Sequence, residues 1–400
     1  MDELSMRYGS ALSYSEAISM RKLIRIGTVA TVFGLGVSLV ACAPATTADG
    51  TAAKQGDNSY ATTGVATTFK SAKELVDSFD TSKLCGDKKL VIAHPRGLGV
   101  GWLLTQDAIL KDHLAKFCPN VTLTTTDAQA DPAKANSDLN SLVAQGVDGV
   151  VIDPLFGEAM LPAMQAVKDA GIPIVTYVSS SGATTGKEVT AVGEVYTKGN
   201  GVLWAEFMNR ALKGKGTIVF LGGGPGQPSS ISNMEAIREN LKQYPGLSLV
   251  EEEFQPISND AAQARTVMSA LLAKHGRIDG VIADNGGVVN TVLEAYDASG
   301  FKPPALAVSA ATNGLNCGWD KRRDFPYFST DGNHMGSISS LRRVLAEING
   351  VKFDQSLTVA PWAVVDTLTP GMEPTCDASA SPDVDWTTSL SDTKVKQLFG

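Results

Sequence analysis

Two glycine-rich stretches have the composition of a phosphate-binding loop. Gly97-x-Gly99-x-Gly101 and residues 222–226 each follow a predicted strand and precede a predicted helix, where the backbone amides of a dinucleotide-binding loop would hold phosphates. Neither stretch has the G-x-G-x-x-G spacing, and Pro225 interrupts the second one. They are weak indications of a nucleotide, and we expect no cofactor.

The residue types that catalysis or metal binding would need are scattered along the chain. The sequence has only four histidines, which are His94, His113, His275 and His334. No H-x-x-x-H, C-x-x-C or G-x-S-x-G pattern places metal ligands, or a nucleophile, at a recognised spacing. The sequence therefore predicts no catalytic residues and no metal site. An enzyme is the weaker alternative, which turnover of a bound molecule would revive.

Four cysteines lie in the body of the chain. Cys85 comes shortly before one apolar run and Cys118 shortly before the next. If these runs are neighbouring parallel strands, about 4.8 Å apart, the two thiols lie at the same end and a disulfide is geometrically reasonable. Cys317 and Cys376 would then pair by elimination. Four free thiols are the alternative.

A fifth cysteine, Cys42, ends a short apolar stretch near the N-terminus. A basic cluster within residues 21–25 precedes the uncharged run 26–41. This run is shorter than the about 20 apolar residues that cross a bilayer, and such a run behind positive charge is typical of a secretory signal. Leu39-Val40-Ala41-Cys42 resembles the bacterial lipobox, which implies that Cys42 receives a lipid and becomes the new N-terminus.

The N-terminal region is therefore predicted to consist of two parts. Residues 1–41 form a signal peptide, with Met20 as an alternative start, and residues 42–84 form a flexible tether that begins with Ala, Thr and Gly. A transmembrane anchor and an ordinary cleaved signal are the other interpretations. We expect the protein to lie outside the cytoplasm, held on the cell membrane by the lipid on Cys42.

Composition limits the partners. The formal net charge is -8 at pH 7, and an acidic chain argues against nucleic acid because phosphate binding needs clustered Lys and Arg. The only basic cluster beyond the signal, residues 321–323, is better explained as a solvated turn. Without residues 1–41 the 400-residue chain has 359 residues, a length that suits two domains with well-buried cores.

Short apolar runs alternate with amphipathic segments from residue 89 onward. Apolar strands separated by helices predict parallel sheets that are buried on both faces, and two such arrays predict two doubly wound α/β domains. Ligands in these domains bind at the carboxyl ends of the strands. The predicted strands are 90–93, 121–125, 149–153, 172–177, 217–221, 247–251, 280–283 and 305–308, and the predicted helices are 102–117, 134–145, 159–170, 195–211, 230–243, 260–274 and 288–299.

Several segments together resemble a known family. They are Asp127-Ala128-Gln129-Ala130-Asp131-Pro132, residues 142–150, Val151-Ile152-Asp153-Pro154, residues 170–176, Gly214-Lys215-Gly216, Tyr244-Pro245-Gly246 and residues 265–268. Their order and spacing over residues 86–365 are similar to the ribose-binding branch of type I periplasmic binding proteins. The resemblance implies two doubly wound parallel-sheet lobes, joined by a three-strand hinge, that close on a ligand. It also implies delivery of that ligand to the permease of an ABC transporter.

The resemblance also implies a domain organisation. The three crossings between the lobes would fall at 177–181, 329–331 and 359–361. The expected parts are an N-terminal lobe of 85–178 plus 331–360, a C-terminal lobe of 179–330 plus 361–376, and a C-terminal tail of 377–400. We expect the tail to lie along the second lobe or to be partly disordered, and we expect a monomer.

The family's sugar-binding positions match this chain only in part. Trp102 matches an aromatic residue that stacks on the sugar, and Asn285 matches an asparagine that binds its hydroxyls. Helix packing is the alternative for Trp102, and a helix N-cap is the alternative for Asn285.

Charged positions of the family are replaced. Its acidic residue after the third strand falls on Phe156, its Asp-Arg pair on Val178 and Ser179, a loop arginine near Ile231, and a late aspartate near Ala311. A buried hydroxyl without a partner costs about 1–3 kcal/mol, so this loss predicts a ligand less polar than a free aldose. A deoxy or substituted sugar, or an aromatic or amphiphilic acid, is expected.

Five further residues near strand ends or crossings are candidate ligand contacts, although each alone is also explained by a structural or surface role. They are Arg96, Tyr177, Gln227, Asn259 and Asp331.

Two other functional classes share this fold. A transcription regulator of the LacI type would carry a DNA-binding domain where this chain has a signal and a tether. A lipid-anchored receptor that reports ligand occupancy to a membrane sensor is not distinguished by sequence from one that serves a permease.

Overall fold

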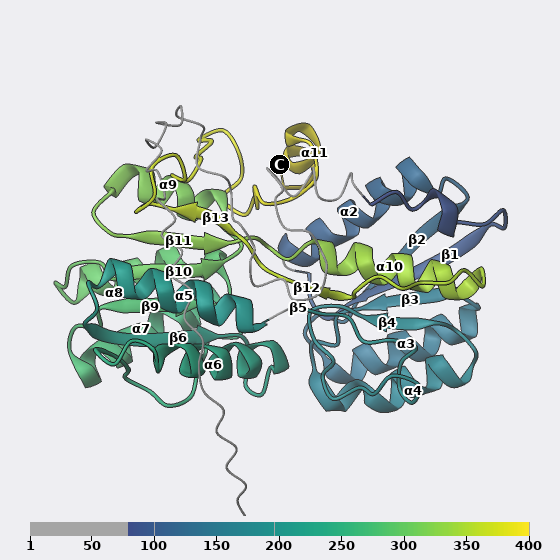
Figure 1. Cartoon of the computed structure of the whole chain (residues 1–400), viewed down its shortest axis with the longest axis horizontal. Helices are drawn as coiled ribbons and strands as arrows, with labels where there is room; N and C mark the ends of the chain where they lie inside the picture. Colours follow the sequence, from purple (N-terminus) through teal and green to yellow (C-terminus); the bar gives the residue numbers. More distant parts are fainter. Residues whose placement is uncertain (1–78, 100, 196, 400) are drawn as a thin grey trace, which may run out of the picture. The chain divides into compact units, whose positions relative to one another are not determined.

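A computed structural model describes residues 79–99, 101–195 and 197–399. The predicted signal peptide, Cys42 and most of the predicted tether lie outside the described residues. Two parallel sheets form the centres of two lobes (Figure 1). In the part of the chain that is described, no helix is both long and apolar enough to span a membrane.

The first lobe contains a four-stranded parallel sheet in the order β2-β1-β3-β4. Side chains alternate between the two faces of β1, so that Ile92 packs into the core on one side and Ala93 into the core on the other. The strands are β1 (Leu90–Arg96), β2 (Val121–Asp127), β3 (Gly149–Ile152) and β4 (Ile174–Thr176). Helices α2 (Gly101–Phe117) and α10 (Met335–Ile348) cover one face, and α3 (Pro132–Gln145) and α4 (Leu161–Asp169) cover the other.

Local signals in the sequence fix the helix ends, as α3 shows. The Asp131 carboxylate accepts hydrogen bonds from the backbone N–H groups of Ala133 and Lys134, and Pro132 occupies the first turn. Gly146 ends the helix in the left-handed conformation, with φ of 68°.

The second lobe contains a seven-stranded sheet in the order β13-β11-β10-β9-β6-β7, with β8 paired to β6. All of its pairings are parallel except that of β13 with β11. The strands are β6 (Gly216–Gly222), β7 (Leu247–Leu249), β8 (Gln255–Pro256), β9 (Gly280–Ala283), β10 (Ala305–Ser309), β11 (Tyr327–Thr330) and β13 (Ala363–Asp366). Helices α5 (Thr197–Ala211) and α6 (Pro228–Leu241) cover one face, and α7 (Ala261–His275), α8 (Val289–Ala298) and α9 (Asn313–Arg322) cover the other.

The remaining elements are short. They are the single turns η1 (Ser82–Leu84), η2 (Gly157–Met160) and η3 (Gly286–Val288), the two-stranded pair β5 (Glu194–Val195) and β12 (Thr358–Val359), and the terminal helix α11 (Asp392–Phe399). The predicted class, two doubly wound parallel-sheet lobes, is confirmed. The sequence did not predict β11, β13, α9, α10 or α11.

The glycine run at 222–226 is explained by packing. A Cβ on Gly222 would collide with the ring of Phe254, and Gly226 has a φ of +73°. The first position therefore requires close approach of the backbone, and the second requires a left-handed turn that glycine adopts without strain.

The first crossing between the lobes lies later in the chain than expected. Residues 177–181 were predicted to cross, but the segment after them returns to the first sheet, where Val189 is fully buried and Thr190 N–H donates to the Ile174 carbonyl. The physical reason is a loop with buried apolar residues and turns at Gly182 and Gly186, both with positive φ. The chain crosses instead after β5.

The three crossings are bonded to one another. β5 pairs with β12 in parallel, which joins the first and third crossings. Asp331 N–H donates to the Trp362 carbonyl, and Trp362 N–H donates back to the Asp331 carboxylate at 3.1 Å, which joins the second and third.

The end of the predicted tether is folded. Residues 79–84 pack on the first lobe, where Thr81 is fully buried and its hydroxyl contacts His113 Nε2 at 2.7 Å. The boundary at residue 84 is therefore too late, because this segment has apolar residues such as Leu84 that join the core of the first lobe.

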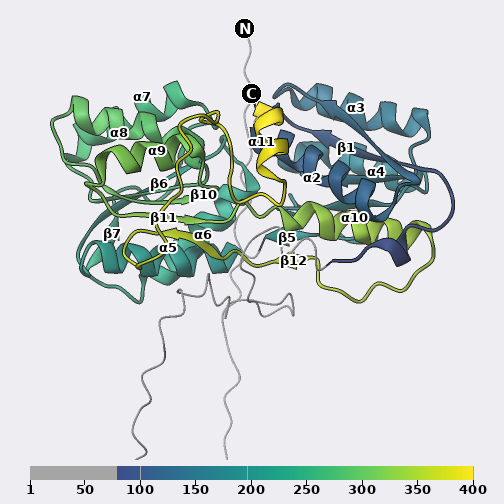
Figure 2. The same ribbon diagram turned by 90° about the horizontal axis from the view of Figure 1, so that it is seen from above.

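The C-terminal tail lies on both lobes, which differs from the prediction. Its start is held on α9, where Asn313 Nδ2 donates to the Asp377 carbonyl at 2.9 Å. Its end forms α11, which lies beside α2 (Figure 2) and buries Val395 in the first lobe. Burial of this apolar face explains why the tail is ordered rather than extended along one lobe.

Both expected cysteine pairs are bonded in the structure. Cys85 and Cys118 have Cα atoms 5.4 Å apart, and Cys317 and Cys376 have Cα atoms 4.7 Å apart. The first pair lies within the first lobe, and the second ties α9 to the start of the tail.

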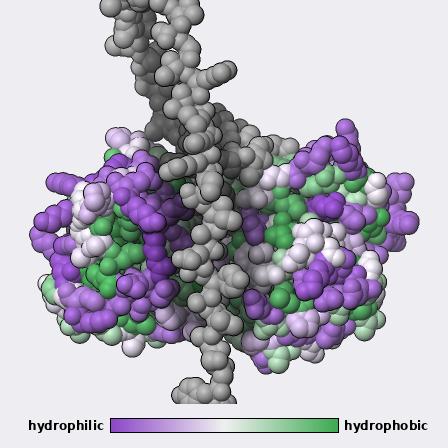
Figure 3. Space-filling model, turned by 60° about the horizontal axis from the view of Figure 1, so that its bottom comes forward, coloured by the Kyte–Doolittle hydropathy of each residue, from purple (hydrophilic) through white to green (hydrophobic). Residues whose placement is uncertain are grey.

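Hydrophilic residues cover most of the outer flanks of both lobes on the face shown in Figure 3. Among the described residues, the large apolar side chains that are exposed are Val91, Ile231, Val351 and Leu368. Val91 and Ile231 lie far from Val351 and Leu368 in the sequence. Ile231 borders a groove that is described below.

Candidate functional site

Residues from both lobes line a cavity of about 150 Å³, which we call the ligand cavity. A space of about this volume is large enough for a six-membered ring such as benzene. Most of the lining residues follow the carboxyl end of a strand, where ligands bind in doubly wound sheets. They are Leu98, Trp102, Leu103, Asp153, Leu155, Val178, Asn200, Gln227, Ser229, Asn233, Asn259, Asp284, Asn285, Ser309, Ala310, Gly332 and Asn333.

Trp102, in the first turn of α2, supplies an aromatic surface to the cavity. Its indole N–H donates to the Gly332 carbonyl at 2.6 Å, so the polar edge of the ring is already bonded. Its ring centroid lies 6.2 Å from that of Tyr177 and 6.1 Å from that of His334. These contacts fix the ring in place and make stacking on a ligand the contribution of Trp102.

Asp284, directly after β9, is the end of a hydrogen-bonded relay. Its carboxylate accepts from Ser230 Oγ at 2.5 Å and from Asn233 Nδ2 at 2.9 Å. The Asn233 Oδ1 in turn accepts from Asn200 Nδ2 at 3.2 Å. Burial raises the pKa of Asp284 to about 6, although the Ser230, Asn233 and Gly223 donors lower it. An ionised carboxylate only accepts hydrogen bonds. Asn233 must therefore donate to Asp284 and accept from Asn200, so Asp284 fixes the orientation of both amides.

Asp153, directly after β3, has no such support. Among the described residues, no hydrogen bond or ion pair is made to its carboxylate. Burial alone raises the pKa of Asp153 to about 7. Its half-buried side chain lines the ligand cavity, so its carboxyl group can form a hydrogen bond or an ion pair with a ligand there.

Four cavity residues other than glycine have left-handed backbone conformations. Val178, Asn259, Ala310 and Asn333 have φ of 72°, 55°, 59° and 54°. Such conformations cost energy, above all for a β-branched residue such as Val178. They cluster at binding and catalytic sites, and their concentration here supports a functional cavity.

A buried polar network lies behind the Trp102 ring. The Tyr177 hydroxyl is 2.5 Å from His94 Nε2, and His94 Nδ1 is 2.5 Å from the Asp107 carboxylate. The other Asp107 oxygen contacts Arg96 Nε at 2.9 Å. Burial, followed by the nearby charges of Asp153 and Asp107, raises the pKa of Tyr177 well above its usual value, so the hydroxyl stays neutral and the network holds β1, α2 and the loop after β4 together.

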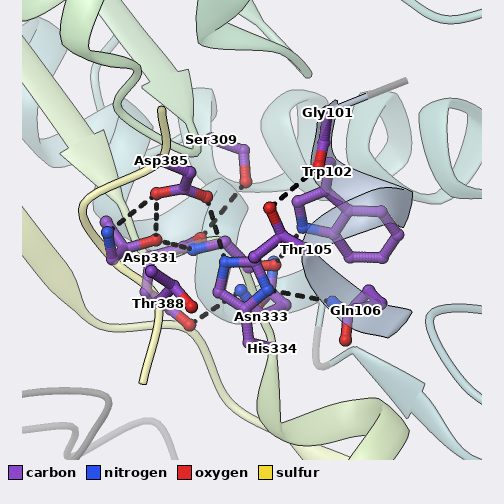
Figure 4. A network of polar contacts seen from close by, with 12 residues as sticks. Gly101, Trp102, Thr105, Gln106, Ser309, Asp331, Asn333, His334, Asp385 and Thr388 are labelled. Atoms are coloured by element: carbon purple, nitrogen blue, oxygen red, sulfur yellow. Dashed lines mark hydrogen bonds and ion pairs between the residues drawn. The ribbon is translucent and has the colours of Figure 1, made fainter. Parts of the chain in front are cut away.

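A second network joins the tail to the first lobe near the second crossing (Figure 4). His334 lies between Gln106, whose Nε2 is 3.0 Å from His334 Nδ1, and Asp385, whose Oδ2 is 3.0 Å from His334 Nε2. The Thr387 hydroxyl accepts from Gly332 N–H at 2.9 Å. The tail therefore contacts a residue that lines the ligand cavity.

The structure brings together four of the nine residues that the sequence suggested as ligand contacts. Trp102, Gln227, Asn259 and Asn285 line the ligand cavity. Asn285 is also the N-cap of η3, because its Oδ1 accepts from Gly287 N–H at 2.8 Å. Binding and capping are thus compatible for this residue.

The other five suggested residues lie elsewhere. Phe156 and Ser179 line a groove that shares Val178 and Ser229 with the ligand cavity. Tyr177, Arg96 and Asp331 do not line the cavity: the first two belong to the buried network, and the third joins two crossings, where burial raises its pKa to about 7.

Sequence reasoning missed Asp153, Asp284, Asn200, Asn233 and Asn333. Asp153 is the last residue of one predicted strand and Asp284 directly follows another, and this position at a strand end is the signal that would have found them. Asn200 lies in the first turn of α5 and Asn233 in the second turn of α6, and their proximity follows only from the packing of the two helices side by side.

The fold and the cavity define a two-lobed α/β protein with a cavity that both lobes line. A model of the periplasmic binding protein domain matches residues 101–319, and the chain belongs to this family. Among the described residues, no group of His, Cys, Asp and Glu is arranged to hold a metal ion.

Individual relatives match over shorter stretches. The ribose import binding protein of Bacillus subtilis is 34% identical over 175 residues, which are 44% of this chain and 55% of that protein. The xylitol-binding protein of Mycolicibacterium smegmatis is 26% identical over 199 residues, which are 49% of this chain and 56% of that protein. The chain thus spans about half the length of these curated relatives.

Solved structures match the fold more completely. An ABC transporter solute-binding protein from Bacillus halodurans with bound myo-inositol is 20% identical, with a TM-score of 0.61, and the match covers 70% of this chain and 96% of that one. A myo-inositol-binding protein from Caulobacter is 18% identical, with a TM-score of 0.61, over 70% of this chain and 94% of that one.

Proposed function

We propose that this chain is an extracytoplasmic solute-binding lipoprotein. It captures a sugar or sugar-like molecule between its two lobes and delivers it to the permease of an ABC transporter. The observation that carries the proposal is the ligand cavity, where the aromatic face of Trp102 and the Asp153 carboxylate from one lobe meet the Asp284 carboxylate and the amides of the other. The named ligands and transport roles of the relatives above support the same class.

The polarity of the cavity favours a hydroxylated ligand over the less polar one that the sequence suggested. The family's acidic position was assigned to Phe156, but Asp153 lines the cavity instead. With Asp284 and the amides of the second lobe, the cavity offers many acceptors to hydroxyl groups. Neighbouring positions thus supply two carboxylates, whereas no described residue that lines the cavity replaces the family's arginines.

Capture is proposed to work by motion of the lobes about the three crossings. The parts are those expected from the sequence, with the first crossing moved to the end of β5 and with residues 79–84 and the end of the tail added to the first lobe. Because the lining comes from both lobes and from Gly332 and Asn333 at the second crossing, a bound molecule would favour the arrangement in which both walls contact it.

Export and anchoring are proposed from the sequence motif. The signal peptide 1–41 would be removed and Cys42 would carry the lipid, so that the folded lobes remain at the outer face of the membrane as a monomer. Incorporation of labelled palmitate, and its loss in Cys42→Ser, tests the anchor.

Binding is tested by titrating ligand-free protein with pentoses, hexoses and polyols in a calorimeter. The proposal predicts at least one ligand that binds with a Kd of about 1 µM or less, equivalent to about 8 kcal/mol. Binding of no polyol, sugar or sugar derivative would contradict it, as would chemical turnover of the bound molecule. Loss of uptake of that ligand after deletion of the gene tests the transport role.

A further inference from the structure

The ligand cavity carries negative charge without a compensating cation. Asp153 and Asp284 line it, and none of the other described residues that line it is Lys, Arg or His. Arg96 is the last residue of β1, but its guanidinium forms an ion pair with Asp107, with Nε 2.9 Å from the carboxylate, and lies 3.6 Å from the Asp127 carboxylate. The walls of the site therefore favour a neutral or positively charged ligand and oppose an acid.

The two carboxylates differ in how their charge is stabilised. Asp284 accepts hydrogen bonds from Ser230 and Asn233, so its charge is stabilised from inside the protein. Asp153 receives no side-chain or backbone donor from the described residues. A partly buried carboxylate without a donor from the protein is poorly stabilised, and a donor from the ligand would improve its stabilisation.

The amide oxygen of Asn200 is a second unmatched acceptor. Asn200 is only 2% exposed, and its Oδ1 has no hydrogen-bond partner in the described structure. The orientation of the amide follows from the relay: Asp284 accepts only, so Asn233 must donate to it and must accept from Asn200 Nδ2. The Asn200 oxygen is therefore left for the cavity.

Asn333 adds a third unmatched acceptor, since its Oδ1 is buried and also has no partner in the described structure. A hydroxyl group brings lone pairs as well as a donor, whereas an ammonium group brings three donors and no acceptor. The surplus of acceptors in the cavity thus matches an ammonium better than a set of hydroxyls alone.

The groove next to the cavity has the same charge. Glu158, Glu194 and Glu235 line it, and no described lining residue is basic. All three are exposed. Because a cleft lined by one sign of charge raises the local concentration of the opposite sign, the groove would attract a cation toward the cavity.

We propose that the solute carries a protonated amine, which makes an ion pair with Asp153 while its hydroxyls bind the amides of the second lobe. The ligand class is an amino sugar or an aminated polyol. This inference rests on the proposed function, and it excludes the aromatic or amphiphilic acid that the sequence left open. The Trp102 face would add an attraction for the same cation.

Matched pairs of probes test the inference by calorimetry at about pH 7, where most alkyl ammonium groups keep their proton. The pairs are glucose with glucosamine, galactose with galactosamine, and myo-inositol with its monoamino analogue, and N-acetylglucosamine serves as a neutral amide. We expect the amine to bind about tenfold or more tightly than its hydroxyl partner in at least one pair.

Asp153→Asn should reduce that preference to about unity, since it removes the charge and keeps the shape. Asp169→Asn, an identical change at an exposed position of the same lobe, should leave it intact. The wild-type comparison does not depend on the folding of either variant.

The outcomes separate the inference from the proposed function. Hydroxyl members that bind as tightly as their amines, or more tightly, overturn the inference and leave the proposed function in place. If neither the amines nor their hydroxyl partners bind at about 1 mM, which corresponds to about 4 kcal/mol, both the inference and the proposed function are overturned.

Discussion

The two walls of the ligand cavity are built by the same kind of βα unit but differ in chemistry. The first lobe contributes Trp102, Asp153 and four apolar side chains, which are Leu98, Leu103, Leu155 and Val178. The second lobe contributes mostly amides, hydroxyls and one carboxylate, many of which are bonded to each other before any ligand arrives. One wall thus offers surface and a single charge, and the other offers a prearranged set of polar groups.

The difference suggests that the two walls of the cavity contribute differently to affinity and to selectivity. A preformed polar wall loses little conformational entropy on binding, so it favours selection by hydrogen-bond geometry. An aromatic and apolar wall gains free energy from burial, which is less sensitive to the ligand's stereochemistry. Affinity should therefore depend most on the first wall and selectivity most on the second.

Removal of the aromatic face should have the largest effect. We expect Trp102→Ala to weaken binding by about 2–3 kcal/mol, or roughly 30- to 150-fold, as for a buried aromatic contact at an interface centre. Trp102→Phe keeps a ring and loses only the bond to the Gly332 carbonyl, so its loss should be about 1 kcal/mol. Equal losses of affinity for the two variants, measured by calorimetry, would show that the aromatic face of Trp102 does not contribute to binding.

Disruption of the relay should reduce affinity less and selectivity more. Asp284→Asn introduces a donor where an acceptor is needed, so Asn233 and Asn200 lose their fixed directions. We expect about tenfold weaker binding of the best ligand and a smaller difference between its stereoisomers. Asp320→Asn, on the exposed side of α9, is the control. Unchanged discrimination between stereoisomers would contradict the role given to the second wall.

The Asp153 carboxylate on the first wall should make the stability of the ligand-free protein depend on pH. The pKa of Asp153 is raised by burial to about 7, above its value in an unfolded chain. Stability from this group is therefore complete below about pH 4 and is lost as the pH rises through about 7.

Urea unfolding from about pH 5 to about pH 8 measures this effect as the difference between wild type and Asp153→Asn. The variant should become the more stable protein toward the upper end, by about 1 kcal/mol after allowance for solvent screening. Asp284 and Asp331 titrate in the same direction in both proteins, so they cancel in the difference. If the difference in unfolding free energy between the two proteins did not change with pH, it would contradict a raised pKa at Asp153.

The smallest effects are expected outside the cavity. Phe156→Ala and Ser179→Ala change residues of the adjoining groove, and binding should change by less than about twofold, as for ordinary surface substitutions. A loss comparable with that of Trp102→Ala would mean that the ligand occupies the groove instead.

The sequence predicted the fold class because most strands and helices of the two sheets, up to β10, have local signals of their own. The helix over 134–145 was predicted from its pattern and its final glycine, and the strand at 280–283 was predicted at its observed bounds. Trp102 and Asn285 were found because they follow strands and match family positions.

Other features depend on contacts that no local pattern shows. Asn200 and Asn233 meet only because α5 packs on α6. The loop after Tyr177 was predicted to cross between the lobes, and its return to the first sheet depends on burial of Val189. The tail looked polar, yet one face of α11 buries Val395 against the first lobe.

The most direct test of the account is a crystal structure of the protein isolated from its own source with whatever molecule it retains. We expect a hydroxylated molecule in the ligand cavity, with its ring on the face of Trp102 and with hydrogen-bond donors directed at Asn200 Oδ1 and at the Asp153 carboxylate. A molecule bound only in the adjoining groove, or one whose acidic group contacts Asp153, would contradict it.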